Sequence, residues 1–192
     1  MKVGVLALQG DFLEHQKVLE GLSVEVNQVR LAEDLVGLDG LIIPGGESTT
    51  IGKLAVDFNL MEPLRDFART HAVWGTCAGS ILLSNDARRD QPLLEVMDIQ
   101  VARNAFGRQV DSFETDIQFP VLSPYREGNP PFHAVFIRAP LIEKVGENAQ
   151  AIGWLPDGKI IAARQGFWLA TSFHPELTED DRFHKYFLEM VQ

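Results

Sequence analysis

The residues with the clearest chemical potential surround Cys77, the only cysteine of the 192 residues. Gly75 stands two positions before it and Gly79 two positions after it, between an apolar run and a helix-like run. This pattern is typical of a nucleophile elbow, a cramped strand-to-helix turn whose glycines let neighbouring backbone approach. The helix N-terminus would stabilise a thiolate, and the N–H of Ala78 would face an oxyanion. Because a lone cysteine is also often a buried apolar residue, the hypothesis needs partners elsewhere in the chain.

A base for this thiol is available in the segment Ser172-Phe173-His174-Pro175-Glu176. Pro175 biases His174 toward an extended backbone, and in extended backbone residues i and i+2 point the same way. We therefore expect Glu176 to lie beside His174 and to orient its imidazole, as a thiol nucleophile requires of its base. Taken alone, the same residues are also consistent with a turn that caps the last helix.

A third candidate element is the loop Pro44-Gly45-Gly46, which follows an apolar run and precedes a helix with Ser48 as its expected N-cap. Consecutive glycines let backbone N–H groups face a ligand. The spacing excludes a phosphate-binding loop, because Gly52 comes one residue too late and Leu54 stands at the Ser/Thr position. We interpret the segment as an oxyanion and substrate loop, in which the N–H of Gly46 acts beside that of Ala78.

Two arginines, Arg103 and Arg138, stand beside apolar residues in the segments 101–108 and 136–140. Either guanidinium could bind a substrate carboxylate bidentately, and a surface salt bridge is an equally good explanation for each. We expect no metal site, because the histidines are scattered without zinc-ligand spacing and no second cysteine is present. No dinucleotide-binding glycine pattern is found, and no cofactor is predicted.

Alternating strand-like and helix-like segments must position these residues. Apolar runs of strand length cover residues 3–8, 24–29, 40–43, 72–74, 134–137, 160–163 and 168–173. Helical patterns cover residues 11–22, 48–58, 61–70 and 179–191. This order predicts an α/β fold of three αβα layers around a mostly parallel open sheet of the flavodoxin-like kind. The three candidate elements all follow strand runs, so we expect them to meet at the carboxyl edge of that sheet.

The composition indicates what broad class of protein this chain belongs to and which partners it disfavours. The length suits a single domain spanning residues 1–192, and a hydrophobic content of 45% is ordinary for a globular protein. Lys plus Arg is 17 and Asp plus Glu is 27, so the net charge of 17 − 27 = −10 disfavours nucleic acid and anionic membranes as partners. One cysteine permits no internal disulfide, which fits a cytoplasmic location. The N-terminal run is too short for a signal peptide or a membrane span.

The chain resembles class I (triad-type) glutamine amidotransferases through Gly75–Gly79, Pro44–Ser48 and His174–Glu176. Within that class it is most similar to the PdxT family, the glutaminase subunits of pyridoxal 5′-phosphate synthase. Segments 6–11, 103–109 and 136–140 carry this narrower resemblance, which extends over essentially the whole chain.

The resemblance implies roles for individual residues. It makes Cys77 the nucleophile, His174 the base and Glu176 its orienting partner. Glutamine contacts would come from the residues Gly46, Glu47, Ser48, Arg103, Ile137 and Arg138. Interface contacts would come from Gln9, Gly10 and Asp11.

The resemblance also implies a partner. The ammonia released from L-glutamine would pass to a barrel-shaped synthase subunit in a hetero-oligomeric complex. Three alternatives stay open at this point: a glutaminase serving a different synthase, a γ-glutamyl hydrolase, and a non-catalytic regulatory module of the same fold.

Overall fold

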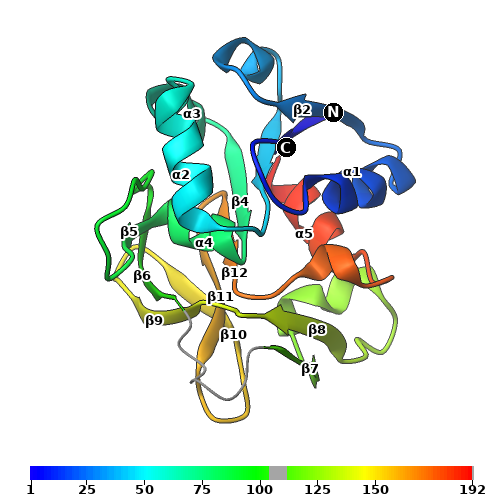
Figure 1. Ribbon diagram of the computed structural model, residues 1–192. Helices are drawn as coiled ribbons and strands as arrows, with labels where there is room; N and C mark the ends of the chain where they lie inside the picture. The colour runs from blue at the N-terminus through cyan, green and yellow to red at the C-terminus, as the bar shows by residue number, and fades with distance from the viewer. Residues whose placement is uncertain (104–111, 192) are drawn as a thin grey trace.

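Strands and helices alternate along the first half of the chain and build one curled sheet with helices on both faces (Figure 1). The computed structural model describes residues 1–103 and 112–191. The strands are β1 (Lys2–Leu6), β2 (Glu25–Val29), β3 (Gly40–Ile43), β4 (Ala72–Thr76), β5 (Ser84–Asp86), β6 (Met97–Ala102), β7 (Ser112–Ile117), β8 (Phe132–Ile137), β9 (Leu141–Val145), β10 (Gln150–Trp154), β11 (Ile160–Gln165) and β12 (Trp168–Thr171). The helices are α1 (Phe12–Gly21), α2 (Ser48–Asp57), α3 (Met61–Ala68), α4 (Ala78–Leu83) and α5 (Arg182–Met190), with 3-10 helices η1 (Ala32–Leu35), η2 (Pro120–Tyr125) and η3 (Pro175–Leu177).

The parallel part of the sheet carries the order β2-β1-β3-β4-β12. β12 is parallel to β4 although it comes about 90 residues later in the chain, with Thr171 beside Thr76 at the end of the register. The carboxyl ends of β1, β3, β4 and β12 therefore lie along one edge, as the sequence predicts for the candidate elements.

Two apolar cores cover the two faces of this sheet. Along β3, Leu41 and Ile43 pack into the core that contains α2, α3 and α4, whereas Ile42 packs into the core that contains α1 and α5. Successive strand residues point to opposite faces, so a strand covered on both sides is apolar throughout. The predicted three-layer αβα fold is confirmed.

The second half of the chain departs from a simple parallel plan. β11, β9 and β6 extend the sheet from β12 with antiparallel pairings, β10 pairs with β11, and β5 rejoins β6 in parallel. β7 and β8 form a separate antiparallel pair, so the apolar run at 134–137 lies outside the main sheet. The sequence interpretation does not predict β5, β9 or β10, which are short or partly exposed strands without a continuous apolar run.

Helix boundaries correct two expectations. Glu47, and not Ser48, is the N-cap of α2, because its carboxylate accepts the N–H of Thr50 at 2.8 Å. α5 begins at Arg182, whereas the sequence pattern places its start at Glu179. Within the described residues, no helix is long and apolar enough to cross a membrane.

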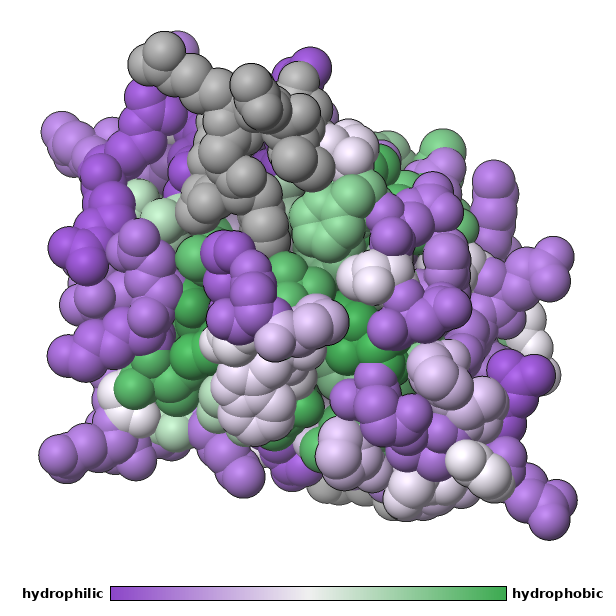
Figure 2. All heavy atoms as spheres, turned by 90° about the horizontal axis from the view of Figure 1, so that it is seen from below, coloured by the Kyte–Doolittle hydropathy of each residue, from purple (hydrophilic) through white to green (hydrophobic). Residues whose placement is uncertain are grey.

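The lower end of the molecule, as oriented in Figure 1, combines apolar and polar surface. Seen from below, apolar side chains gather near the middle of this face and hydrophilic side chains surround them (Figure 2). Exposed large apolar residues in the second half of the chain include Ile137, with 41% of its surface exposed, and Trp154, with 48% exposed.

Candidate active site

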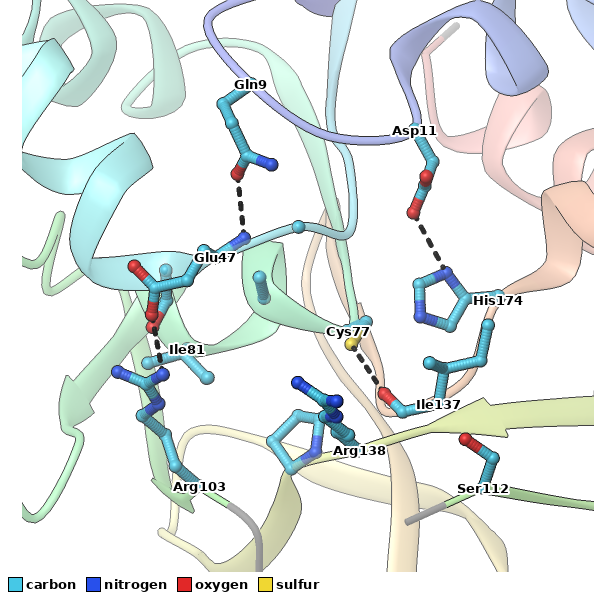
Figure 3. A pocket seen from close by; sticks show the side chains of 14 residues that line it. Gln9, Asp11, Glu47, Cys77, Ile81, Arg103, Ser112, Ile137, Arg138 and His174 are labelled. Atoms are coloured by element: carbon cyan, nitrogen blue, oxygen red, sulfur yellow. Dashed lines mark hydrogen bonds and ion pairs between the residues drawn. The ribbon is translucent and has the colours of Figure 1, made fainter.

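Loops at the carboxyl edge of the sheet surround a cavity of about 590 Å³. Gln9 and Asp11 follow β1, Gly46 follows β3, Cys77 follows β4 and His174 follows β12. The side chains point toward a common space (Figure 3). The lining residues are Gln9, Asp11, Gly46, Glu47, Ser48, Cys77, Ala78, Ile81, Arg103, Ser112, Ile137, Arg138, Pro140 and His174. Of the residues predicted for the site, Gly10 and Glu176 do not line the cavity.

Cys77 occupies the sharp turn between β4 and α4. Its backbone has φ +46° and ψ −107°, a conformation that costs a non-glycine residue free energy and is concentrated at functional sites. Its N–H donates to the carbonyl of Thr171 at 2.8 Å, which continues the β4–β12 ladder one residue past the strand. The residue is 6% exposed, and its Sγ lies 4.0 Å from the carbonyl oxygen of Ile137. The predicted elbow is therefore present.

The two glycines around Cys77 are required by close backbone approach. A Cβ on Gly75 would lie 2.4 Å from the carbonyl oxygen of Gly79, and a Cβ on Gly79 would lie 2.0 Å from that of Ile43. Both distances are far below van der Waals contact. The elbow can therefore pack against β3 only with glycine on either side of the nucleophile.

His174 lies beside the elbow and is held by a carboxylate. Its Nδ1 lies 2.7 Å from Oε1 of Glu176, and its backbone N–H donates to the carbonyl of Val135 in β8 at 2.9 Å. The expected contact is present, but its backbone basis differs from the prediction. Pro175 begins the 3-10 helix η3, so the carboxylate returns to the imidazole through a tight turn instead of an extended strand.

The electrostatics of this pair favour an imidazolium. Burial opposes the charge on His174, but the hydrogen bonds and charges of Cys77 and Glu176 outweigh it and raise the pKa of His174 to about 11. Burial raises the pKa of Glu176, and the interaction with His174 partly offsets that increase. A cysteine beside a cationic imidazole is suited to act as a thiolate nucleophile.

The loop after β1 lies against the glycine loop after β3. The N–H of Asp11 donates to the carbonyl of Gly45 at 3.1 Å, and a Cβ on Gly10 would lie 1.8 Å from that same oxygen. Oε1 of Gln9 accepts the N–H of Glu47 at 2.7 Å. Of the residues predicted for an interface, Gln9 and Asp11 therefore line the cavity, whereas Gly10 packs against Gly45 without lining it.

Asp11 also reaches the base. Its Oδ2 lies 3.5 Å from Nδ1 of His174, the atom that Glu176 contacts at 2.7 Å. Asp11, His174 and Glu176 are the one group of described residues whose ligand atoms could together hold a metal ion, within 4.8 Å of one another. Scattered positions in the sequence thus conceal this grouping. A metal there would occupy the nitrogen that Glu176 already contacts, so it would compete with the orienting bond.

Glu47 and Arg103 bind each other at the cavity wall. Arg103 donates Nη2–H to Oε1 of Glu47 at 2.6 Å, while Thr49 and Thr50 donate to Oε2. Burial acts against the charge on Glu47, but these donors outweigh it and lower its pKa to about 2. Ser48 is buried, and its hydroxyl lies 3.4 Å from Oε1 of Gln91.

Arg138 differs from Arg103 in its surroundings among the described residues. It is exposed, has φ +45°, and makes no ion pair with any residue in the ranges 1–103 and 112–191. It follows Ile137 at the end of β8, and both residues line the cavity. The segment 104–109, which contributes to the family resemblance, lies outside the described residues.

The sequence interpretation missed several residues at or behind the site. Ile81, Ser112 and Pro140 line the cavity, and His15 and His184 lie buried behind Glu176. Ile81 stands four residues after Cys77, one helical turn away, so that spacing would have found it. His15 stands in the same relation to Asp11, whereas nothing local to His184 indicates its contact with His15, 169 residues away in the chain.

Comparison with known proteins agrees with this geometry. The family model described as SNO glutamine amidotransferase family matches residues 5–192. The pyridoxal 5′-phosphate synthase subunit PdxT of Herpetosiphon aurantiacus is 60% identical, covering 98% of this chain and 99% of the relative. That of Moorella thermoacetica is 56% identical, with full coverage of both chains. The chain therefore belongs to the SNO glutamine amidotransferase family.

Solved structures are similar as well. A crystal structure of a glutamine amidotransferase is 49% identical and superposes with a TM-score of 0.89 over 98% of each chain. The structure of PurLQS from Thermotoga maritima has a TM-score of 0.75 at 13% identity and shares the fold alone.

Proposed function

We propose that this chain is the glutaminase subunit of a pyridoxal 5′-phosphate synthase. It hydrolyses L-glutamine to L-glutamate and ammonia, with Cys77 as nucleophile, His174 as acid and base, and Glu176 as orienting carboxylate. The observation that carries the proposal is the convergence of a strained cysteine elbow and a 2.7 Å His174–Glu176 contact at one cavity. The names of its relatives and its family membership support the same conclusion.

In the first half of the reaction, the Cys77 thiolate attacks the side-chain amide carbon of glutamine, and a C–S bond forms. The N–H groups of Gly46 and Ala78 stabilise the tetrahedral oxyanion. The imidazolium of His174 then gives its proton to the amide nitrogen. The C–N bond then breaks, ammonia leaves, and a glutamyl thioester remains on Cys77.

In the second half, neutral His174 takes a proton from water as that water attacks the thioester carbon. The C–S bond breaks, glutamate leaves with the new oxygen, and the thiolate–imidazolium pair is restored. Glu176 keeps the imidazole in one orientation through both halves, because its Oε1 holds Nδ1 and leaves Nε2 for the proton transfers.

Substrate recognition uses the two arginines differently in this proposal. Arg138, whose guanidinium has no ion-pair partner among the described residues, binds the α-carboxylate of glutamine, whereas Arg103 acts by holding Glu47 in place. Glu47 stays ionised at physiological pH and would accept hydrogen bonds from the substrate ammonium group. Ile137 and Ser48 complete the walls around the substrate.

The proposal includes a partner and a location. The chain forms one glutaminase domain over residues 1–192 and releases ammonia to a separate synthase subunit bound near Gln9, Gly10 and Asp11. It requires no cofactor for the hydrolysis. An unpaired nucleophilic cysteine needs reducing surroundings, which supports a cytoplasmic location.

A glutaminase assay with and without the cognate synthase subunit tests the proposal. We expect glutamate formation that increases when the synthase subunit is added and that is lost in Cys77→Ala, with the fold retained. Full activity in Cys77→Ala would refute the assigned nucleophile. Equal turnover with and without the synthase subunit would refute the role as its dedicated ammonia source.

A further inference from the structure

The carboxylate of Glu176 has a second neighbour that the proposed reaction does not use. Its Oε2 is buried and lies 3.3 Å from Nε2 of His15, and both side chains are 0% exposed. Among the described residues this oxygen has no partner with hydrogen-bond geometry, and the 3.3 Å contact with His15 is an ion-pair distance. His15 comes from α1 and reaches Glu176 from the side opposite the cavity.

His15 is in turn held by two further buried groups. Its Nε2 lies 3.1 Å from the hydroxyl oxygen of Thr76, and its Nδ1 lies 3.0 Å from Nε2 of His184 in α5. Trp74 packs edge-on against both imidazole rings, with centroid distances of 5.6 and 5.0 Å. The two hydrogen bonds, to Thr76 and to His184, orient the ring of His15.

The contacts also determine which nitrogens carry protons. If Nε2 of His15 carried no proton, its lone pair would face Oε2 of Glu176 at 3.3 Å. The proton of His15 would then be on Nδ1 and would point at Nε2 of His184, so the proton of His184 would have to be on Nδ1. That Nδ1–H would be buried without a partner among the described residues. With Nε2–H on both rings, His184 donates to His15, and His15 presents its N–H toward Thr76 and Glu176. Of the four ring nitrogens, only the bare Nδ1 of His184 then lacks a hydrogen-bond partner among the described residues. The second arrangement leaves no buried N–H unsatisfied.

Both histidines are suited to stay neutral in this role. Burial lowers the pKa of His15 well below its ordinary value, and the nearby His184 and His174 lower it further. Burial lowers the pKa of His184 to about 3. Neutral rings with fixed tautomers can direct an N–H without adding a second positive charge next to His174.

We propose that His15 is a positioning residue for the glutaminase reaction: its Nε2–H, fixed by His184, supports the second oxygen of Glu176. This inference rests on the proposed function. It extends the Cys77–His174–Glu176 arrangement by two buried imidazoles that lie outside the cavity and do not touch substrate. The N–H of His15 stabilises the ionised form of Glu176, which keeps the imidazolium of His174 in place during proton transfer.

A matched pair of substitutions distinguishes the contact of His15 Nε2 with Glu176 from the contact of its Nδ1 with His184. His15→Gln places an amide N–H at the position of Nε2 and so keeps the donor toward Glu176. His15→Asn places its amide oxygen at the position of Nδ1, which keeps the acceptor for His184 but removes the donor. Trp74→Phe is the structural control, because it removes a buried hydrogen bond to Thr171 from the same aromatic cluster without touching Glu176.

The assay is glutamate formation by the full chain with its synthase subunit. We expect His15→Asn to lower kcat about tenfold or more with little change in KM, since the buried N–H that lies 3.3 Å from the ionised carboxylate of Glu176 is lost. His15→Gln and Trp74→Phe should stay within about threefold of wild type. Equal losses in His15→Asn and Trp74→Phe, or a fully active His15→Asn, would overturn the proposal.

The pH profile gives a readout that a structural role would not move. The groups near Glu176 are His174 and Asp11 on the cavity side and His15 from α1, and His15 in turn contacts Thr76 from β4 and His184 from α5. Loss of the His15 donor raises the pKa of Glu176, so the acid limb of kcat should move to higher pH in His15→Asn and not in His15→Gln. An unmoved acid limb in His15→Asn would contradict the proposal.

Nitrogen NMR of histidine-labelled protein tests the tautomers directly. We expect His15 and His184 both to be neutral with the proton on Nε2. A proton on Nδ1 of His15, or a cationic ring, would overturn the proposal whatever the kinetics show. This measurement needs no turnover, so it tests the tautomers of His15 and His184 even if the wild-type complex has no glutaminase activity. Absence of that activity would refute the proposed function, and the NMR result would still decide the arrangement of the two imidazoles.

Discussion

Arg103 and Glu47 bind each other at the cavity wall, with Nη2 of the arginine 2.6 Å from Oε1 of the glutamate. The charge of Arg103 is therefore committed before substrate arrives, whereas Arg138 at the same cavity has no ion pair within the described part of the chain. Two arginines with similar sequence surroundings thus differ in the structure, because one is held in an ion pair and the other has no ion pair among the described residues. Substitution by methionine, which keeps length and removes charge, distinguishes those tasks.

Arg138→Met should raise KM for glutamine by about tenfold or more, because a charge-assisted bond to the substrate carboxylate is lost. Its kcat should change less, since the carboxylate is remote from the reacting amide. Arg103→Met should give the smaller KM increase, because Glu47 keeps its bonds from Thr49 and Thr50. Steady-state kinetics with the synthase subunit measure both values. A larger KM effect at Arg103 would reverse the assignment of the carboxylate contact.

The parts of the site whose residues are close together in the sequence could be predicted from the sequence alone. The elbow at Cys77 and the His174–Glu176 pair depend on glycine spacing and on a two-residue separation. The residues behind them could not be predicted, because His15 meets His184 only after α1 and α5 pack on the same sheet face. The ion pair of Arg103 is equally non-local, because its partners are 56 positions apart in the chain.

The same division holds for the fold. The buried parallel strands are continuous apolar runs, which the sequence shows directly. β9 has only one fully buried residue among its five positions, and its place between β11 and β6 depends on antiparallel pairing with distant strands. Edge and hairpin strands of this kind carry too little periodicity to be recognised without their partners.

Two carboxylates approach Nδ1 of His174, and their distances predict unequal importance. Glu176→Gln should lower kcat by about three to four orders of magnitude, because a neutral amide can select the wrong tautomer and no longer stabilises the imidazolium. Asp11→Asn should cost less than about tenfold, since Oδ2 of Asp11 lies 3.5 Å away and is partly exposed. Glutaminase kinetics on the two variants decide the order. Equal losses would mean that Asp11 shares the orienting role.

Buried neutral histidines predict acid sensitivity of the fold. Burial on folding lowers the pKa of His184 from an ordinary value of about 6.5 to about 3, so below pH 6.5 the unfolded chain binds a proton that the folded chain does not. The free energy of unfolding therefore decreases as pH falls from about 6.5 toward 3. The contribution is about 1.4 kcal/mol per pH unit from this residue once pH is well below 6.5.

His184→Phe removes that proton-binding difference. Urea unfolding between pH 8 and pH 4 should show a lower stability than wild type at pH 8, where the bond to His15 is lost, and a shallower decline toward acid. The difference between the free energies of unfolding of wild type and His184→Phe should decrease as pH falls. A decline parallel to that of wild type would show that His184 is protonated in the folded state.

Gly79, the glycine that follows Cys77 in the elbow, has a strict steric requirement. A methyl group on Gly79 would lie 2.0 Å from the carbonyl oxygen of Ile43, so Gly79→Ala must push α4 away from β3 and displace Cys77 with it. We expect a loss of several kcal/mol in stability, or failure to accumulate folded protein, as for other overpacked backbone contacts.

Gly21 at the end of α1 is the matched control, because a Cβ there would meet nothing within 4 Å. Gly21→Ala should be neutral or stabilise the protein by up to about 1 kcal/mol through reduced chain entropy. Thermal unfolding of the two variants measures the contrast. If Gly79→Ala unfolded within a degree or two of wild type and kept its glutaminase activity, the close approach of the elbow to β3 would not be what demands glycine at that position.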